Sequence, residues 1–555
     1  MIRVPIKMIR RLGVLAVLFT LARLAPPLVG QQNGSPATSA LHVGAEDLLR
    51  TPVGENWPSY NGDYTGRRFS SLSEINTSNV GQLRAAWVFH PGNTQRLEAT
   101  PVVVRGVMYL TSANDVFALD ASTGRSLWHY SRPISSGLLD DAAAHKSRGV
   151  AVWDHFVYSE TDDARLICLD ARSGNLLWDV QYADKVKQYG ATSAPLIVKD
   201  EVIVGTSGGD SGVRGFVAAF DAQKGTLRWK LWTIPGPGEF GSSSWPGDLY
   251  LHGGATTWMP GTYDPELDTV YWTTSNAAPD FDGSSRPGDD LYTACVLAID
   301  PNTGKMKWYF QFTPHDLYDY DANETPVLVD REENGTTRHL LLQANRNGFF
   351  YVLDRTDGKF LRAFPFLDKV TWATGIDSSG RPILSGLVPT QEGTHICPGI
   401  VGATNWFSPS FNPGTGLFYV MALENCNIYF SKPKPFTQGE TFYGTGTKHP
   451  LDEHSRKILL ALSPDGKKVW RYPQAGRGGS WGGTLTTAGG LVFFADDAES
   501  FEAVNAQTGE PLWHFNTSQS FSASPMTYSV DGVQYVVIAA GSDVFTFTLP
   551  HQNPN

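Results

Sequence analysis

The sequence predicts an all-β fold, an eight-bladed β-propeller, from its composition and one internal repeat. Hydrophobic residues make up 41%, enough for a large core, while 56 glycines and 35 prolines indicate many tight turns. A length of 555 residues would ordinarily indicate several domains, but the copies of the repeat are spaced by about the length of one four-stranded blade, which predicts a single domain. Coiled-coil and disordered classes are excluded, and the net charge of −11 disfavours a nucleic-acid partner.

The first 30 residues have the layout of a secretory signal peptide. Basic residues precede the apolar run Leu12–Leu21, and small residues end at Gly30. Cleavage there would place the mature chain in the periplasm, whereas an uncleaved anchor is the alternative interpretation. No other stretch approaches the roughly 20 apolar residues of a membrane helix, so no stable membrane insertion is expected after cleavage. Residues 31–55 are rich in small polar residues and predict a flexible linker, and residues 56–550 are assigned to the propeller.

The repeat is an eleven-residue unit with alanine first, aspartate third, glycine seventh and tryptophan last. In each copy, one strand ends, a polar turn containing glycine follows, and an aromatic residue lies at the start of the next strand. This pattern predicts a β-hairpin. Clear copies are Ala118–Trp128, Cys168–Trp178, Ala219–Trp229, Ala298–Trp308 and Ala503–Trp513, and weaker ones are Val352–Arg362 and Ala461–Trp470.

The spacing of the turn glycines predicts the number of blades. Most spacings fall between 43 and 54 residues, the length of one blade. One spacing of 79 residues contains an insertion, and the 108 residues between Gly358 and Gly466 have room for a blade without the signature. Seven copies and this hidden blade predict eight blades. Trp87, in the run AAWVF, is expected in an N-terminal strand that closes the ring against the C-terminal blade.

This repeat resembles the tryptophan-docking motif of the quinoprotein alcohol dehydrogenases, eight-bladed propellers that hold pyrroloquinoline quinone (PQQ) on their axis. The resemblance extends from about Trp57 to Thr548. Non-catalytic propellers of the outer-membrane assembly machinery have a similar repeat, so the repeat alone predicts the fold and not the chemistry.

Motifs between the repeats resemble the family's cofactor site. A tricyclic quinone with three carboxylates needs an aromatic floor, cationic donors and hydroxyls, which Trp258, Arg148 and Ser207 would supply. Taken singly, Trp258 would be a core residue and Ser207 a turn residue; the joint order of the motifs favours the cofactor site. The resemblance implies that the quinone contacts Glu98, Arg148, Thr192, Ser207, Trp258, Arg346, Asn405, Trp406 and Trp481.

The resemblance also implies a metal ion held by Asp210, Asn276, Asp319 and Asp321. Hard oxygen donors select calcium or a lanthanide rather than zinc or copper. Aspartate at position 321 is similar to lanthanide-dependent members, and three carboxylates suit a trivalent ion, so we favour a lanthanide over calcium. Asp210 stands where the family has glutamate, so the ion must shift or the backbone must move inward.

The four cysteines divide into a disulfide and two core residues. Cys397 and Cys426 match the family's disulfide positions, whereas Cys168 and Cys295 occupy apolar strand positions. Many members cover the quinone with a ring of adjacent disulfide-bonded cysteines, and this chain has Ala142–Ala143 there, so that lid is missing or built differently. These 555 residues contain no Cys-x-x-Cys-His motif, so a c-type haem is not expected in them.

Together, these features resemble a dehydrogenase that oxidises a primary or secondary alcohol. Asp319 would accept the hydroxyl proton, and Arg346 would stabilise charge on the reduced quinone. Electrons would pass to a soluble c-type cytochrome, and a homodimer is compatible with the sequence.

Two alternative functions remain open. A non-catalytic envelope scaffold gives Asn276 and Trp258 no role, and a hydrolase or lyase using Asp319 and Asp321 leaves both arginines unexplained.

Overall fold

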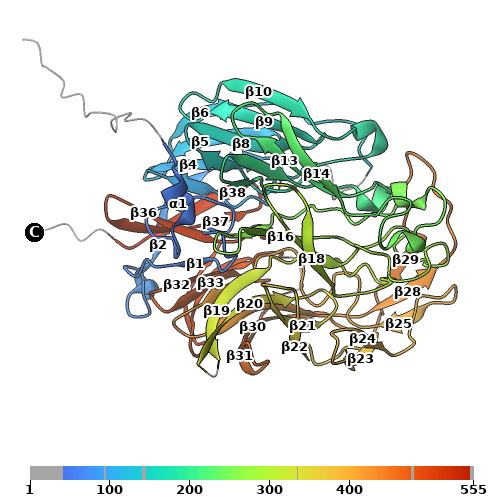
Figure 1. Cartoon of the computed structure of the whole chain (residues 1–555). Helices are drawn as coiled ribbons and strands as arrows, with labels where there is room; N and C mark the ends of the chain where they lie inside the picture. Colours follow the sequence, from blue (N-terminus) through green and yellow to red (C-terminus); the bar gives the residue numbers. More distant parts are fainter. Residues whose placement is uncertain (1–41, 93–95, 140–144, 334, 477–479, 551–555) are drawn as a thin grey trace, which may run out of the picture. The chain divides into compact units, whose positions relative to one another are not determined.

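Strands make up almost all of the regular structure (Figure 1). The computed structural model describes residues 42–92, 96–139, 145–333, 335–476 and 480–550. The expected signal peptide and the pair Ala142–Ala143 lie outside these residues. In the described part of the chain, no helix has the length and apolar character needed to cross a membrane. The helical elements are α1 (Ala45–Leu49) and the 3-10 turns η1 (Val80–Gln82), η2 (Lys185–Lys187), η3 (Gly209–Ser211), η4 (Ser242–Ser244) and η5 (Leu249–Leu251).

Eight sheets of four or five strands are found in the described residues, and five of them are built from four consecutive antiparallel strands. The first two consist of β3 (Val102–Val104), β4 (Val107–Ser112), β5 (Asp115–Asp120) and β6 (Ser126–Tyr130), then β7 (Ala151–Trp153), β8 (Phe156–Thr161), β9 (Arg165–Asp170) and β10 (Leu176–Gln181). The next two are β11 (Leu196–Val198), β12 (Glu201–Val204), β13 (Phe216–Asp221) and β14 (Leu227–Trp232), then β15 (Thr262–Asp264), β16 (Thr269–Thr273), β17 (Cys295–Ile299) and β18 (Met306–Gln311). The fifth is β19 (Val327–Glu333), β20 (Thr336–Ala344), β21 (Phe349–Asp354) and β22 (Phe360–Pro365).

The other three large sheets join strands that are separated along the chain. One contains β26 (Ser410–Asn412), β27 (Leu417–Glu424), β30 (Arg456–Leu462) and β31 (Lys468–Pro473). Another adds β1 (Phe69–Ser70) in parallel to β32 (Thr484–Thr487), followed by β33 (Leu491–Ala495), β34 (Ser500–Asn505) and β35 (Pro511–Asn516). The last pairs β2 (Arg84–Phe89) with β38 (Asp543–Thr548), next to β37 (Val533–Ala540) and β36 (Met526–Val530).

The eighth large sheet corrects the expected position of the hidden blade. The long interval from Gly358 to Gly466 holds two small sheets and the first strands of the Gly466 sheet. The eighth sheet instead joins β2 to the C-terminal strands, with Trp87 opposite Thr546, so the expected pairing of the Trp87 strand with the C-terminal sheet is confirmed. This sheet could not be recognised from the repeat, because its strands come from the two ends of the chain and form no repeat copy in the sequence. The small sheets are β23 (Ala373–Ile376) with β24 (Pro382–Leu384), and β25 (Thr394–Ile396) with β28 (Asn427–Ser431) and β29 (Thr445–Lys448).

Aromatic rings connect consecutive large sheets through the turn glycines. A Cβ at Gly174 would lie 2.6 Å from Cε3 of Trp128, and Trp128 Nε1 donates to the carbonyl of Ala171 at 3.0 Å. Where the repeat has Arg362, the ring of Phe364 lies over Gly466 instead. Equivalent ring–glycine contacts are Trp87–Gly124, Trp178–Gly225, Trp229–Gly304, Trp308–Gly358 and Trp470–Gly509. Each turn therefore needs a residue without a side chain, because an aromatic ring occupies that space.

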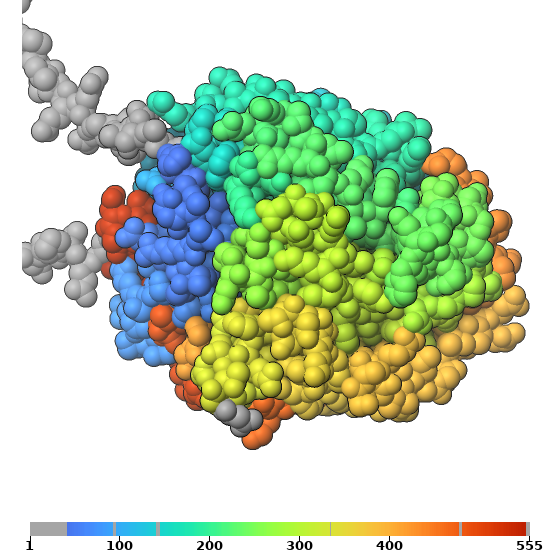
Figure 2. All heavy atoms as spheres, viewed as in Figure 1, coloured from blue at the N-terminus to red at the C-terminus, as the bar shows by residue number. Residues whose placement is uncertain are grey.

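The segment before the first large sheet is packed, which corrects part of the expected linker. Val43 exchanges two main-chain hydrogen bonds of 2.9 Å with Asp154, and Val43, Leu48 and Val53 are buried. Figure 2 shows these N-terminal residues in blue against the rest of the described chain. The linker prediction over 31–55 is therefore wrong for residues 42–55, because three apolar side chains among polar neighbours are enough to anchor it.

Candidate active site

The predicted site residues lie at one end of the large sheets. In an antiparallel sheet, the start of the first strand and the end of the second are at the same end. Residues in loops that precede a first strand are Glu98, Arg148, Thr192, Trp258, Asp319, Asp321, Asn405, Trp406 and Trp481, and those that follow a second strand are Ser207, Asp210, Asn276 and Arg346. The repeated topology thus gathers side chains that are far apart in the sequence.

Arg148 is at the centre of the predicted cofactor residues. Its side chain is 3% exposed, and its Cζ lies 4.9 Å from the ring centroid of Trp258 and 4.7 Å from that of Trp406. The guanidinium donates to Glu98 Oε2 at 2.8 Å and to the carbonyl of Thr192 at 2.9 Å. Two aromatic faces and two oxygen acceptors hold this cation in one orientation.

Three indoles form the apolar part of the site. The rings of Trp406 and Trp481 are stacked with centroids 6.5 Å apart, and Trp258 packs against the same cluster. Asn405 positions this segment, because its Oδ1 accepts the N–H of Trp406 at 2.8 Å and its Nδ2 donates to Val401 at 2.9 Å. The structure therefore brings all three predicted tryptophans together, beside Arg148.

Asp319 and Asp321 share one guanidinium. Arg346 places Nη2 3.1 Å from Asp319 Oδ2 and Nη1 3.2 Å from Asp321 Oδ2. Asp319 has a left-handed backbone (φ 63°), a conformation that non-glycine residues seldom adopt and that is often found at functional sites. Asp321 also accepts the main-chain N–H of Asn276 at 2.6 Å and Nε1 of Trp258 at 3.1 Å. Asp321 thus connects the predicted metal ligands to the predicted cofactor floor.

Asp210 is brought to the Asn276 segment by glycine packing. A Cβ at Gly209 would lie 3.1 Å from Thr256 Oγ1 and 3.4 Å from Ser275 Oγ, so the Ser207–Asp210 loop rests on the residue before Asn276. The main-chain oxygen of Asp210 accepts the N–H of Phe442 at 2.6 Å.

The electrostatics of the site favour a bound cation. Burial raises the pKa of Asp319 well above its ordinary range, and the charge of Asp321 adds to this although Arg346 opposes it. Burial also raises the pKa of Asp321. A cation placed among these carboxylates would lower both pKa values and so stabilise the ionised forms.

Two further acidic residues of the site were not predicted from the sequence. Asp280 and Glu324 are each 2% exposed. Asp280 Oδ1 and both carboxyl oxygens of Glu324 find no hydrogen-bond partner among the described residues. Burial raises both pKa values, and for Asp280 the charges of Asp210, Asp319 and Asp321 add to the effect. The only sequence signal was spacing: Asp280 follows Asn276 by four residues, and Glu324 follows Asp321 by three.

Buried donors on this surface also fit a polyanionic, flat cofactor. Within the described ranges, Arg148 Nε, Arg346 Nε and Ser207 Oγ are buried without a hydrogen-bond partner. A buried donor left unpaired costs free energy, so each is a place for an acceptor from a ligand. Carboxylates of a planar quinone beside stacked indoles satisfy that requirement.

Glu160 is connected through Tyr182 to the segment that carries Ser207. It is 2% exposed, and the hydroxyl of Tyr182 lies 2.8 Å from Glu160 Oε2 and 3.2 Å from the carbonyl of Gly205. One hydroxyl proton cannot serve both acceptors fully, whereas a protonated Glu160 could donate to Tyr182 while Tyr182 donates to Gly205. Consistently, burial raises the pKa of Glu160 to about 8.

We expect Glu160 to make stability depend on pH. Between its ordinary pKa of 4.5 and about 8, the folded protein binds a proton that the unfolded chain lacks, so the free energy of unfolding falls as pH rises through this window. Glu160→Gln mimics the protonated side chain, so its stability relative to wild type should increase from about pH 5 to about pH 8. Denaturant unfolding at both pH values measures this, and a pH-independent difference would contradict it.

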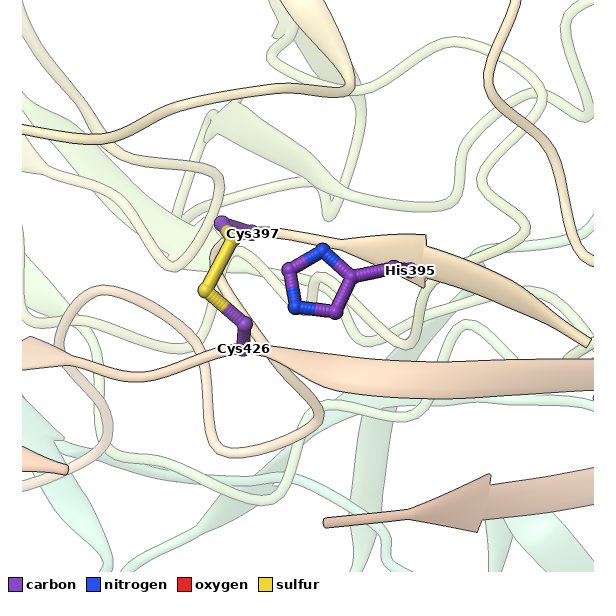
Figure 3. Close-up of side chains that lie close together, drawn as sticks. All are labelled: His395, Cys397 and Cys426. Carbon is purple, nitrogen blue, oxygen red and sulfur yellow. A yellow bond between two sulfur atoms is a disulfide. The ribbon is translucent and has the colours of Figure 1, made fainter. Parts of the chain in front are cut away.

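The predicted disulfide between Cys397 and Cys426 is confirmed, with an S–S distance of 2.05 Å. His395 lies beside it (Figure 3), but both sulfurs are bonded to each other and are not free to bind a metal. The carbonyls of Pro398 and Ile400 in this loop accept the Tyr320 hydroxyl at 2.5 Å and Arg346 Nη2 at 2.7 Å. The loop therefore supports both sides of the acidic site. As expected, Cys168 and Cys295 are buried and free.

Comparison with known proteins identifies the family of the chain. Residues 57–365 and 463–536 match the family model of the glucose/ethanol/alcohol dehydrogenase β-propeller domain. The chain is 38% identical over 530 residues to quinoprotein alcohol dehydrogenase PedH of Pseudomonas putida, covering 90% of this chain and 88% of that protein. It is 39% identical over 551 residues to the quinohemoprotein alcohol dehydrogenase of Comamonas testosteroni, covering 92% and 76%.

Solved structures give the same result. The crystal structure of the Comamonas testosteroni enzyme superposes with a TM-score of 0.83 at 34% identity, covering 90% of this chain and 82% of that one. A europium-containing methanol dehydrogenase also superposes with a TM-score of 0.83 at 31% identity, covering 90% and 99%. The chain therefore belongs to the family of PQQ-dependent alcohol dehydrogenases, all-β enzymes of the β-propeller type.

Proposed function

We propose that this protein is a periplasmic quinoprotein dehydrogenase that oxidises a primary or secondary alcohol to the carbonyl compound. The observation that carries the proposal is the set of contacts made by Asp321, which join Asn276, Trp258 and Arg346 into one site. The basic and apolar leader supports export, and a soluble c-type cytochrome is the proposed electron acceptor.

The chain's own residues have distinct parts in the proposed reaction. A PQQ held by these residues would supply the hydride acceptor, and a metal ion held by the carboxylates would supply Lewis acidity. Asp319 takes the proton from the substrate hydroxyl at a carboxyl oxygen, and its contact with Arg346 holds it in place. Arg346 stabilises negative charge on the reacting oxygen of the cofactor. Arg148, Thr192 and Ser207 bind cofactor carboxylates, with Glu98 orienting Arg148.

The aromatic residues and the oxygen ligands complete the site. Trp258, Trp406 and Trp481 bind the planar rings and exclude water, with Asn405 positioning Trp406. Asp210, Asn276, Asp319 and Asp321 would hold one lanthanide or calcium ion, because all offer hard oxygen ligands. The three carboxylates leave less uncompensated charge with a trivalent ion than with a divalent one.

The architecture that we propose is a single eight-bladed propeller. Each of the eight large sheets would be one blade, and the ring–glycine contacts would be the tryptophan-docking interactions between blades. Trp513 Nε1 donates to the carbonyl of Leu83 at 3.2 Å, next to the strand that carries Trp87, which supports closure of the circle.

The function can be tested by reconstitution. Purified apoprotein is mixed with PQQ and either lanthanum or calcium, and dye reduction is measured with a panel of primary and secondary alcohols. We expect alcohol-dependent dye reduction that requires both PQQ and the metal. Quinone binding without alcohol oxidation by any panel member would contradict the proposal.

Lanthanum should activate the wild-type protein more strongly than calcium, and Asp321→Ala should remove that advantage. The reason is charge, because Asp321 is buried and adds one carboxylate to the site. Asp321→Asn is the matched control, since it keeps an oxygen that can accept the Asn276 N–H while removing the charge. Full activity with calcium alone in all three proteins would show that the charge of Asp321 does not select the ion.

A further inference from the structure

Asp280 is a buried carboxylate for which the reaction proposed above provides no role. It lies in the loop that follows β16, four residues after Asn276, and its side chain is 2% exposed. Its Oδ1 is fully buried and, within the described part of the chain, has no hydrogen-bond partner. A buried carboxylate oxygen without a donor is costly unless a ligand or cation satisfies it.

Hydrogen bonds of nearby residues place Asp280 between the Asp210 loop and the loop that carries Asp316, Asp319 and Asp321. The next residue, Phe281, donates its N–H to the carbonyl of Tyr443 at 2.9 Å, and the adjacent Phe442 donates to the carbonyl of Asp210 at 2.6 Å. On the other side, the Arg286 side chain donates to the carbonyl of Asp316 at 2.7 Å.

The Arg286 side chain also contacts the main chain at Pro279 and Asp280, and so connects the Asp280 segment to the loop that carries Asp316. The same guanidinium donates to the carbonyl of Pro279 at 3.0 Å and contacts that of Asp280 at 3.4 Å. The Asp280 loop is therefore hydrogen-bonded both to the loop that accompanies Asp210 and to the loop that carries Asp319 and Asp321, which are predicted metal ligands.

Four buried or partly buried carboxylates in this region affect one another through their charges. Asp280 interacts electrostatically with Asp210, Asp319 and Asp321, all of the same sign. Arg346 pairs with two of them, Asp319 and Asp321. Arg286 also favours the ionised form of Asp280, but it pairs with Asp290 as well, and the side chains of Arg286 and Asp290 are fully buried. A cation bound among the four carboxylates would offset their mutual repulsion.

Resting on the proposed function, we infer that Asp280 is a fourth carboxylate of the metal site, acting together with Asp210, Asn276, Asp319 and Asp321. Four carboxylates attract a trivalent ion more strongly than a divalent ion of similar size, because the electrostatic attraction scales with the charge of the ion. Asp280 therefore raises the affinity for lanthanides more than that for calcium.

The test measures metal binding directly, without an enzyme assay. Terbium is titrated into apoprotein without PQQ, and its luminescence is followed on excitation of tryptophan, since Trp258 contacts Asp321. Lanthanum and calcium are then added as competitors. Asp280→Asn preserves the shape of the side chain and removes its charge. Asp282→Asn is the matched control, because Asp282 is a buried carboxylate of the same loop whose Oδ1 already accepts the Ser284 N–H at 3.1 Å.

We expect Asp280→Asn to weaken terbium and lanthanum binding by about 10–100-fold, the usual loss when a group that supports a metal site is removed. The calcium affinity should fall by a smaller factor, and Asp282→Asn should bind like wild type. Thermal unfolding separates this effect from misfolding. Without metal, Asp280→Asn should be at least as stable as wild type, because it removes a buried carboxyl group whose ionised form is repelled by Asp210, Asp319 and Asp321, whereas the stabilisation by lanthanum should be smaller.

Equal lanthanide affinity in Asp280→Asn and wild type would overturn the inference. So would a variant that is less stable without metal and gains as much from lanthanum as wild type does, since Asp280 would then be structural. Neither result bears on alcohol oxidation, which the reconstitution assay measures separately with wild-type protein. Conversely, a wild-type protein that binds lanthanides through Asp280 but oxidises no alcohol would contradict the proposed function only.

Discussion

Asp319→Asn is expected to lower the turnover number by about 10²–10⁴-fold, the usual contribution of a positioned general base. Asparagine has nearly the same shape and can still accept a hydrogen bond from Arg346, but it cannot take up the substrate proton. Because Arg346 retains its contact with Asp321, the cofactor surface should persist and quinone affinity should change little.

Turnover with the best alcohol and quinone binding by spectroscopic titration are the two measurements for this variant. Asp282→Asn, a buried carboxylate of a neighbouring loop, should keep wild-type turnover and so controls for the removal of an acidic residue. Unchanged turnover in Asp319→Asn would remove this residue from the mechanism. A loss of quinone binding that accounts for the whole decrease would assign it to cofactor retention instead.

Replacing both Cys397 and Cys426 with alanine should reduce the free energy of unfolding by about 3–4 kcal/mol, the loop-entropy value for a cross-link of this span. The disulfide closes a separation of 29 residues and lies in the loop that supports Tyr320 and Arg346. The variant should therefore also have a lower turnover number, because Tyr320 and Arg346, which adjoin Asp319, would lose a rigid loop to which they are hydrogen-bonded.

Denaturant unfolding measures this loss, and peptide mapping of the non-reduced wild-type protein should find the linked pair. Cys168→Ala is the matched control. Cys168 is buried and free, and it occupies the position at which four other clear repeats have alanine, so its replacement should be nearly neutral. Equal stability of the double variant and the control would show that the disulfide contributes little. Free thiols at both positions would contradict the bond itself.

The repeat allowed most of the fold to be predicted, because each copy encodes a turn and the aromatic residue after it. Both features are local, and the ring–glycine contacts of the structure follow them closely. The copy that ends in Arg362 is the one for which the repeat did not predict the aromatic residue. The aromatic contact is supplied by Phe364, two residues later, and Arg362 Nε donates to the carbonyl of Pro464 at 3.0 Å, much as the indole of Trp128 donates to Ala171.

The candidate site was predictable where motifs surround its residues, and not elsewhere. Arg148, Trp258, Asp321 and Arg346 stand in recognisable segments, and the structure brings them into mutual contact or into contact with shared partners. Asp280 is a single acidic residue in a polar loop, and such residues are ordinarily solvated. It is set apart only by the burial of its Oδ1, which has no hydrogen-bond partner among the residues that the structure describes.

By itself, the sequence determined the fold class and the family resemblance, since these depend on residue types at short and regular spacings, and the resemblance in turn implied the disulfide. Only the tertiary structure decided that the eighth large sheet joins the two ends of the chain and that residues 42–55 are packed. It also decided that Asp280 lies between the Asp210 and Asp319 loops. The physical reason is the same in each case. Strand pairing between distant segments and the burial of single charges depend on what the rest of the chain places beside them, and no local pattern encodes that.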